Sequence, residues 1–177
     1  MKKILKLIAS VVNKLQIFYL EPTELAKRKG VKLGRDCKLN KKITWGSEPY
    51  LISIGDNFYC SSNITFITHD GSVHILRMQE RDKERFGYFG PIKIGDNVFI
   101  GYGVTILPNS NIGSNVIVGA CSLVKGELKS NSVYAGIPAK YICSIDDYLN
   151  KIKPHLDEIP IGENAKKVFL SKKYMDI

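Results

Sequence analysis

Aliphatic residues recur at every sixth position between residues 94 and 129. Six consecutive hexads open with Ile or Val, and four of these continue with Gly; the opening residues are Ile94, Ile100, Ile106, Ile112, Val118 and Val124. The fifth position is also small or aliphatic in every hexad: Val98, Val104, Ser110, Val116, Ser122 and Leu128. A period of six fits neither a helix nor the alternation of a hairpin strand, and short fixed periods are typical of solenoids. The pattern therefore predicts a parallel β-helix.

A hexad can form one short strand plus one corner, and three corners close a triangular coil of about 18 residues. Coils stacked ~4.8 Å apart place Ile94 below Ile112 on one face. On the other two faces, Ile100 lies below Val118 and Ile106 lies below Val124. Each face then carries a ladder of inward aliphatic side chains. Gly after the aliphatic residue and Asn nearby suit corners where a side chain would clash or where φ is positive.

Earlier hexads are less regular and open at Leu33, Leu39, Trp45, Ile54, Cys60 and Phe66, with three extra residues before Ile54. The tetrapeptide Ile-Gly-Asp-Asn occurs at both 54–57 and 94–97. Phe66 and Ile94 are 28 residues apart, where one further hexad would take six. We therefore expect residues 70–91, approximately, to project as a loop from one corner. Long loops on rigid scaffolds often carry function.

Both ends of the chain predict helices. Residues 1–20 combine apolar residues at helical spacing with four lysines, which predicts an amphipathic helix too short and too polar to span a bilayer. This helix either packs on its own coil stack or lies on an anionic membrane surface. A second helix is expected over 145–153, before Pro154. The predicted organisation is a helical segment 1–30, a β-helix 31–143 and a helix with a tail 144–177.

Composition narrows the range of partners. The 177 residues include 26 Lys and Arg against 17 Asp and Glu, and this excess permits an anionic ligand or surface. No nucleic-acid-binding motif accompanies the charge, so we expect no nucleic acid partner. The four cysteines lie far apart and no histidines stand at metal-ligand spacing, which favours reduced cysteines and no metal site. The N-terminus lacks a signal-peptide cleavage site, so we expect a cytoplasmic protein, at the inner face of the membrane if the N-terminal helix binds lipid.

Residues 31–143 resemble the hexapeptide-repeat acetyltransferases, which include sugar, maltose/galactoside and xenobiotic O-acetyltransferases. The resemblance rests on the hexads, on Ile67-Thr-His-Asp-Gly, on the return from Pro91 to Gly101, and on Tyr134-Ala-Gly-Ile-Pro-Ala-Lys. It implies a mainly β fold, a left-handed parallel β-helix with the inserted loop. It also implies a homotrimer in which acetyl-CoA lies in the groove between neighbouring prisms and the loop reaches across the interface.

A sugar hydroxyl is too weak an acid to attack a thioester unaided, so a base must take its proton. A neutral imidazole is available near pH 7 and can contribute ~10²–10⁴ in rate. His69 matches the family's catalytic histidine, although a corner histidine bonded to backbone is the alternative. Asp70 either orients the imidazole or forms a turn before Gly71. No serine or cysteine has a histidine partner at a recognisable spacing, so we expect direct transfer in a ternary complex.

The resemblance also places the binding residues. The backbone N–H of Tyr102 matches the family's oxyanion donor, although the family has a smaller residue there. By the same resemblance CoA lies against Gly101, Gly119, Ala120, Gly136, Ile137, Pro138, Ala139 and Lys140, and no metal is required. His74 and Arg77, inside the loop, are candidates for contact with the acceptor.

The sequence thus predicts an acetyl-CoA-dependent O-acetyltransferase acting on a sugar hydroxyl, in a cell-surface polysaccharide or its precursor. Two alternatives stay open. One is a xenobiotic (antibiotic) O-acetyltransferase, and the other is a non-catalytic β-helix that binds a partner through its loop.

Overall fold

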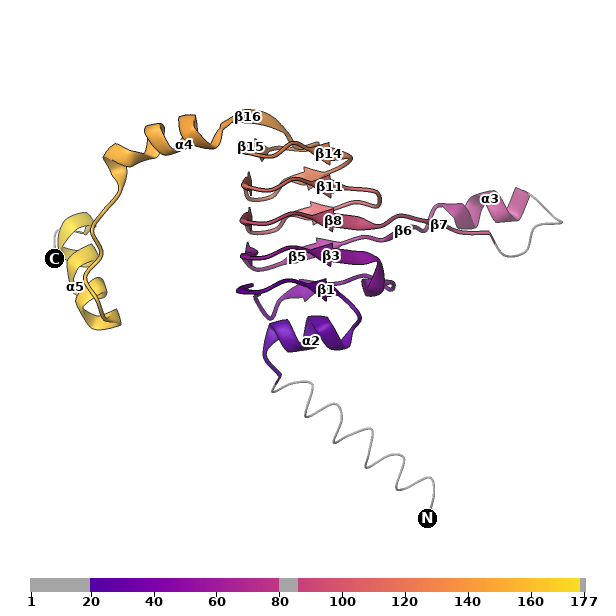
Figure 1. Cartoon of the computed structure of the whole chain (residues 1–177), viewed down its shortest axis with the longest axis horizontal. Helices are drawn as coiled ribbons and strands as arrows, with labels where there is room; N and C mark the ends of the chain where they lie inside the picture. The colour runs from indigo at the N-terminus through magenta and orange to yellow at the C-terminus, as the bar shows by residue number, and fades with distance from the viewer. Residues whose placement is uncertain (1–19, 80–85, 176–177) are drawn as a thin grey trace, which may run out of the picture. The chain divides into compact units, whose positions relative to one another are not determined.

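The computed structural model describes residues 20–79 and 86–175, and the amphipathic helix expected over residues 1–20 lies almost wholly outside them. The chain divides into two compact units, Met1–Ile145 and Asp146–Ile177. The first unit is a prism of short strands in three sheets, as the hexads predict (Figure 1).

The chain visits the three sheets in turn, so each circuit adds one coil. The first sheet contains β1 Lys32–Leu33, β3 Ile52–Ile54, β8 Ile92–Ile94, β11 Asn111–Ile112 and β14 Glu127–Leu128. The second contains β4 Tyr59–Cys60, β9 Val98–Ile100, β12 Val116–Val118, β15 Ser132–Ala135 and β16 Lys140–Ser144. The third contains β2 Ile43–Thr44, β5 Ile64–Phe66, β10 Thr105–Ile106 and β13 Leu123–Val124. Pairing within them is parallel except between β15 and β16.

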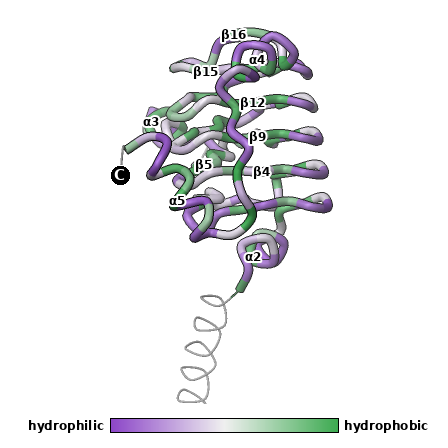
Figure 2. The backbone as a smooth tube through the Cα atoms, turned by 90° about the vertical axis from the view of Figure 1, so that its left-hand side faces the viewer, coloured by the Kyte–Doolittle hydropathy of each residue, from purple (hydrophilic) through white to green (hydrophobic). Residues whose placement is uncertain are grey.

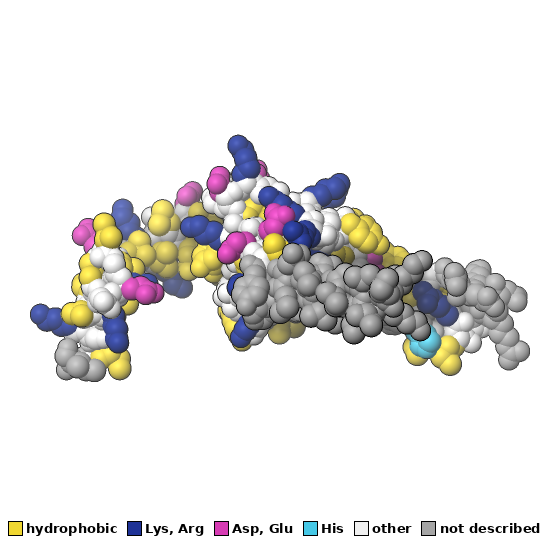
Figure 3. Space-filling view, turned by 90° about the horizontal axis from the view of Figure 1, so that it is seen from below, with side chains coloured by type: hydrophobic (Ala, Val, Ile, Leu, Met, Phe, Trp, Pro, Cys, Tyr) yellow, Lys and Arg dark blue, Asp and Glu magenta, His cyan; other side chains and the backbone are white. Residues whose placement is uncertain are grey.

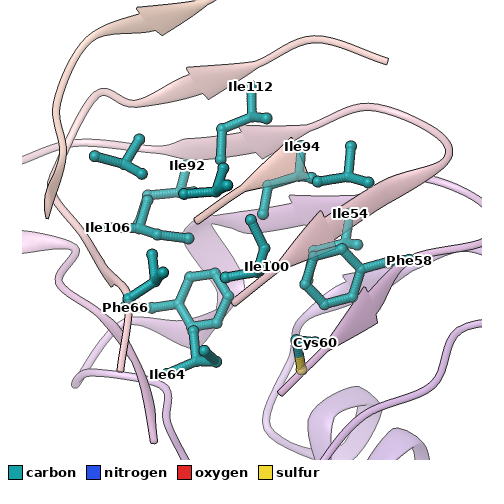
Figure 4. Close-up of a cluster of buried hydrophobic side chains, with 14 of the residues drawn as sticks. Ile54, Phe58, Cys60, Ile64, Phe66, Ile92, Ile94, Ile100, Ile106 and Ile112 are labelled. Atoms are coloured by element: carbon teal, nitrogen blue, oxygen red, sulfur yellow. The ribbon is translucent and has the colours of Figure 1, made fainter. Parts of the chain in front are cut away.

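The strand register confirms the predicted aliphatic ladders. Ile112 pairs with Ile94 in the first sheet, and the equivalent pairs in the second and third sheets are Val118 with Ile100 and Val124 with Ile106. All six side chains are buried. Phe58, Phe66 and several isoleucines of neighbouring coils pack together inside the prism (Figure 4). Hydrophobic and hydrophilic residues alternate along the coils (Figure 2), because successive residues of a strand point to opposite faces.

Asn and Gly at the corners serve two different needs. Asn57, Asn97, Asn115 and Asn131 have φ between 55° and 58°, and their side-chain amides form a ladder of hydrogen bonds of 2.8–3.0 Å along one edge. The glycines instead permit close stacking. A Cβ on Gly95 would lie 2.6 Å from the Oγ and 2.8 Å from the backbone nitrogen of the serine in the coil above.

The expected projection leaves the corner that follows β5. It is an arm in which β6 His69–Asp70 pairs antiparallel with β7 Tyr88–Phe89, and it carries the helix α3 Val73–Gln79 (Figure 1). The antiparallel pair returns the chain to the same corner, so the coil below and the coil above keep their register. The described part of the arm therefore contains two strands and a helix, whereas the sequence predicted a loop.

Helices lie at both ends of the described chain. The helix α2 Pro22–Arg28 lies under the N-terminal coil, and its Ala26 is fully buried in the core (Figures 1 and 2). At the other end, α4 Ile145–Ile152 confirms the predicted C-terminal helix, and η2 Lys153–His155 and α5 Glu163–Tyr174 follow. The remaining short helix, η1 Pro49–Leu51, precedes β3. None of the helices in the described ranges is long and apolar enough to cross a membrane.

Candidate active site

His69 lies where the arm leaves the prism, three residues after β5. The adjoining Thr68 is fully buried, and its carbonyl accepts a 2.8 Å hydrogen bond from the N–H of Gly90 on the returning strand. His69 pairs with Phe89 across the arm, and their rings are 6.2 Å apart. Pairing with the returning strand thus fixes the backbone of His69, while the imidazole ring stays partly exposed.

The imidazole contacts a carboxylate. Nδ1 of His69 lies 3.0 Å from Oε2 of Glu48 and 3.2 Å from Oγ of Ser47. The hydroxyl of Thr68 donates a 2.7 Å hydrogen bond to the same Glu48 oxygen. An ionised carboxylate can only accept, so Nδ1 carries the proton and Nε2 keeps its free lone pair. This is the tautomer that a general base requires.

Glu48 is ionised in this environment. Its side chain is only 15% exposed, and burial by itself acts to raise the pKa of the carboxyl group. The hydrogen bonds from Thr68 and His69 outweigh that effect and bring the pKa of Glu48 below its ordinary value. A negative charge therefore stays beside Nδ1 of the imidazole.

Asp70 was expected either to orient the imidazole or to form a turn before Gly71. In the structure its side chain forms the turn. Its Oδ1 accepts a 2.9 Å hydrogen bond from the N–H of Ser72, an Asx turn at the tip of β6. Hydrogen bonds from Ser72 also lower the pKa of Asp70. The structure places Glu48, and not Asp70, against Nδ1 of His69.

Sequence reasoning missed Glu48, although the hexads contain the signal. Thr44 pairs with Thr65, so the two hexads that open at Trp45 and Phe66 are stacked. Glu48 and His69 each occupy the fourth position of these hexads. Glu48 and His69 are 21 residues apart, and this separation hides their stacking. It exceeds the regular coil length by the three extra residues that precede Ile54.

A surface cavity of about 690 Å³ adjoins His69. Its lining comes from the arm and from the corners of the two coils above: Ile67, His69, Asp70, Gly71, Tyr88, Leu107, Pro108 and Lys125. The cavity is bordered by charge of both signs, from Asp70 and Lys125, and by the ring of Tyr88. It has room for a small acceptor beside the imidazole.

The residues predicted to contact CoA lie at a different corner. Gly101 and Tyr102 follow β9 and precede β10, whereas His69 follows β5. Because β5, β10 and β13 run parallel in the third sheet, residues before these strands and residues after them lie at opposite edges. None of the predicted CoA residues lines the cavity at His69. One chain therefore does not bring the two halves of the predicted site together.

The predicted CoA corner is built from small residues. A Cβ on Gly101 would lie 2.6 Å from the backbone nitrogen of Ala120, and one on Gly119 would lie 3.0 Å from a Cβ in the coil above. Gly136 has φ 103°, and its N–H donates to a serine hydroxyl of the coil below at 3.0 Å. The segment continues through a cis peptide bond before Pro138, and its Ile137 is 74% exposed. Ala139 packs against the core, and Lys140 begins β16.

Tyr102 lies at this corner, between β9 and β10. Its ring is half exposed, and its hydroxyl accepts a 2.6 Å hydrogen bond from the side chain of Asn63. The carbonyl of Tyr102 accepts from the N–H of Cys121, whereas its own N–H has no acceptor among the described residues. A free donor is what an oxyanion site needs.

The two loop candidates for acceptor contact lie on the arm, away from the cavity. His74 is exposed on α3, and Arg77 donates a hydrogen bond to the carbonyl of Phe86 and packs against its ring. Neither lines the cavity at His69. Within the described ranges, no group of three or more His, Cys, Asp or Glu side chains is placed to hold a metal ion.

Comparisons with known proteins agree with this architecture. The family model described as bacterial transferase hexapeptide (six repeats) matches residues 91–126. Protein CapG of Staphylococcus aureus is 40% identical over 153 residues, covering 85% of this chain and 87% of that protein. Among solved structures, a maltose O-acetyltransferase from Clostridium difficile 630 has a TM-score of 0.59 at 26% identity, covering 76% of this chain and 83% of that chain. A galactoside acetyltransferase in complex with coenzyme A has a TM-score of 0.52 at 27% identity, covering 79% and 82%.

Proposed function

The chain belongs to the hexapeptide-repeat acetyltransferase family, with its left-handed β-helix, and on this basis we propose that it transfers the acetyl group of acetyl-CoA to a hydroxyl of a sugar. The observation that carries the proposal is the contact between His69 and Glu48 beside an open cavity. The names of the maltose and galactoside enzymes among its structural neighbours support a sugar as the acceptor.

In the proposed mechanism Nε2 of His69 takes the proton of the acceptor hydroxyl while the hydroxyl oxygen attacks the thioester carbonyl carbon. Glu48 stabilises the imidazolium that forms. The backbone N–H of Tyr102 donates to the oxyanion of the tetrahedral intermediate. When the carbon–sulfur bond breaks, the departing CoA sulfur takes the proton from Nε2, and the products are the acetyl ester, free CoA and the original imidazole.

We place this reaction between two copies of the chain in a homotrimer. The cavity at His69 and the corner at Tyr102 occupy opposite edges of the third sheet, so a neighbouring prism is needed to bring the two together. Acetyl-CoA would lie along the small residues from Gly101 to Lys140 of one copy, with its thioester facing His69 of the next.

We further propose that the acceptor belongs to a cell-surface polysaccharide or its precursor, and that the enzyme is cytoplasmic and works at the inner face of the membrane. The amphipathic, lysine-bearing sequence of residues 1–20 motivates this location.

The test is release of free CoA thiol from acetyl-CoA with a panel of acceptors: maltose, galactosides, uronic-acid saccharides and antibiotics with free hydroxyls. We expect a sugar to be the preferred acceptor. The His69→Ala variant should lose about 10³-fold in kcat while still binding CoA, because the ring acts as a base and is not part of the core. The exposed His155, in the other unit, provides the control, and His155→Ala should keep full activity.

Three outcomes would contradict the proposal. Preference for an antibiotic would indicate a xenobiotic acetyltransferase. Unchanged turnover in His69→Ala would exclude the mechanism, and failure of every acceptor to release CoA would favour a binding scaffold.

A further inference from the structure

The positive charge of this protein is concentrated at one end of its sequence. Residues 1–42 contain 12 Lys and Arg against 3 Asp and Glu, whereas residues 43–177 contain 14 of each. The whole net charge of +9 therefore comes from the first 42 residues, and the remainder is neutral. In the structure, residues 21–44 form α2 and the N-terminal coil, which we call the basic end.

Lysines of the basic end lie at the outermost strand of every sheet. Lys32 belongs to β1, which ends the first sheet. Lys38 forms a β-bridge with Tyr59 of β4, the strand that ends the second sheet. The carbonyl of Lys42 accepts a hydrogen bond from the N–H of Asn63, and Lys42 directly precedes β2, which ends the third sheet. Seen from this end, Lys and Arg side chains project from several sides of the prism (Figure 3).

These lysines are free to meet an external partner. Arg28 pairs with Glu24, and Arg35 pairs with Asp56 of the coil above. The six lysines of the basic end are all exposed, and none forms an ion pair with another described residue: Lys27, Lys29, Lys32, Lys38, Lys41 and Lys42. Their charge is thus not consumed within the fold.

Apolar groups occur among these charges. A hollow at the basic end is lined by Leu20, Leu25, Ile43 and Trp45, together with Lys29 and Lys41. The preceding sequence, residues 1–19, adds four lysines, no acidic residue and apolar residues at helical spacing. Apolar and basic side chains together suit the boundary between lipid headgroups and acyl chains.

We propose that the basic end is a docking surface for a membrane that carries anionic lipids. A planar surface can meet the ends of all three sheets at once. The protein has a positive end and a neutral body, and an anionic surface attracts and orients such a charge distribution. With this end on the membrane, the cavity beside His69 opens on the side of the prism and stays accessible. The proposal concerns binding alone and does not depend on the acetyl transfer proposed above.

Lysines at exposed sheet edges also prevent edge-to-edge pairing of chains. Prevention of edge pairing predicts no dependence on lipid charge, so vesicle binding distinguishes this role from membrane docking. The experiment uses the full chain and measures co-flotation with vesicles of pure phosphatidylcholine or of phosphatidylcholine with about one third phosphatidylglycerol, at low and high salt.

The variant replaces Lys32, Lys38, Lys41 and Lys42 with Gln. A matched control replaces four exposed lysines elsewhere with Gln, namely Lys93, Lys129, Lys166 and Lys167, which lowers the net charge by the same amount. We expect wild type and control to bind anionic vesicles within about twofold of each other, and the basic-end variant to bind at least about tenfold more weakly. None should bind pure phosphatidylcholine at comparable strength.

Three results would overturn the proposal. Equal losses in the variant and the control would show that net charge matters and its position does not. An unaffected basic-end variant, combined with loss of binding on deletion of residues 1–19, would assign the interaction to that segment alone. Binding to a short DNA duplex without binding to anionic vesicles would indicate a nucleic acid partner.

Discussion

Oε2 of Glu48 and Nδ1 of His69 lie 3.0 Å apart, although the two residues belong to successive coils. The strand register produces this contact, since Thr44 of β2 is paired with Thr65 of β5 and the two strands end at the same corner. The buried hydroxyl of Thr68 completes the arrangement by donating to the same carboxylate oxygen. A base and the group that orients it are thus fixed by the stacking of the β-helix itself.

The first prediction concerns the role of Glu48. Glu48→Gln should lower kcat about 10- to 100-fold with little change in the KM for acetyl-CoA, because the amide cannot balance the imidazolium charge and leaves the cofactor contacts intact. Glu48→Asp should recover part of the loss. Steady-state CoA release measures both parameters.

Asp70→Asn is the matched control, because this carboxylate lies next to His69 in sequence but bonds to Ser72. We expect its kcat to stay within about threefold of wild type. If Asp70→Asn were the more damaging of the two changes, the assignment of Glu48 as the positioning residue would be wrong.

The second prediction concerns the shared site. His69→Ala removes the base, and Ala120→Trp fills the exposed corner proposed for CoA, so each variant alone should be inactive. After unfolding and refolding together in equal amounts, about one interface in four would combine an intact His69 with an intact corner. Activity should then return to about a quarter of the wild-type value.

Sedimentation of the same mixture should give the mass of three chains. A site contained within one chain predicts no recovery of activity, and monomers in the centrifuge would exclude the shared site directly. Refolded wild-type protein controls for losses during the procedure.

The third prediction tests coil stacking. Gly95→Ala places a Cβ 2.8 Å from a backbone nitrogen of the next coil, where no flexible side chain can move aside. We expect a loss of about 2–3 kcal/mol in the free energy of unfolding, measured with denaturant. Gly71→Ala, at a position with no atom within 4 Å, should change this free energy by less than about 0.5 kcal/mol. Equal losses of stability in Gly95→Ala and Gly71→Ala would show that crowding between coils does not cause the loss.

The fourth prediction concerns acid stability. The N–H and guanidinium of Arg35 lower the pKa of Asp56, and the pKa of Glu48 is also lowered, since the hydrogen bonds from Thr68 and His69 outweigh the opposing effect of burial. A carboxyl group with a lowered pKa in the folded state stabilises the fold above its unfolded pKa, about 4, and this contribution is lost as pH falls through the folded value. The Tm should therefore fall below about pH 4.

The variant that carries both Glu48→Gln and Asp56→Asn should show a smaller fall in Tm over the same pH range, as measured by thermal melts. An equally steep fall would place the acid sensitivity in other carboxylates. The comparison depends on the change with pH and not on the Tm at pH 7, so a general loss of stability does not obscure it.

Much of the fold could be predicted from sequence because its determinants are local. Each hexad carries its own inward positions, as Ile94 and Val98 show, and its own corner residues, such as Asn97 with its positive φ. The long interval before Ile94 located the projection, because a coil cannot absorb extra residues inside a strand. His69 could be predicted as the candidate base because it lies at the start of that projection.

Only the tertiary structure decided how these pieces meet. The partner of His69 depends on the register between coils of unequal length, which local periodicity does not fix, and so Glu48 was missed while Asp70 attracted attention by its nearness in sequence. The separation of His69 from Gly101 and Tyr102 likewise requires knowing that strands of one sheet run parallel, which sends the residues before and after them to opposite edges. Repeats of six residues define what points inward, whereas stacking in three dimensions defines which outward-facing groups become neighbours.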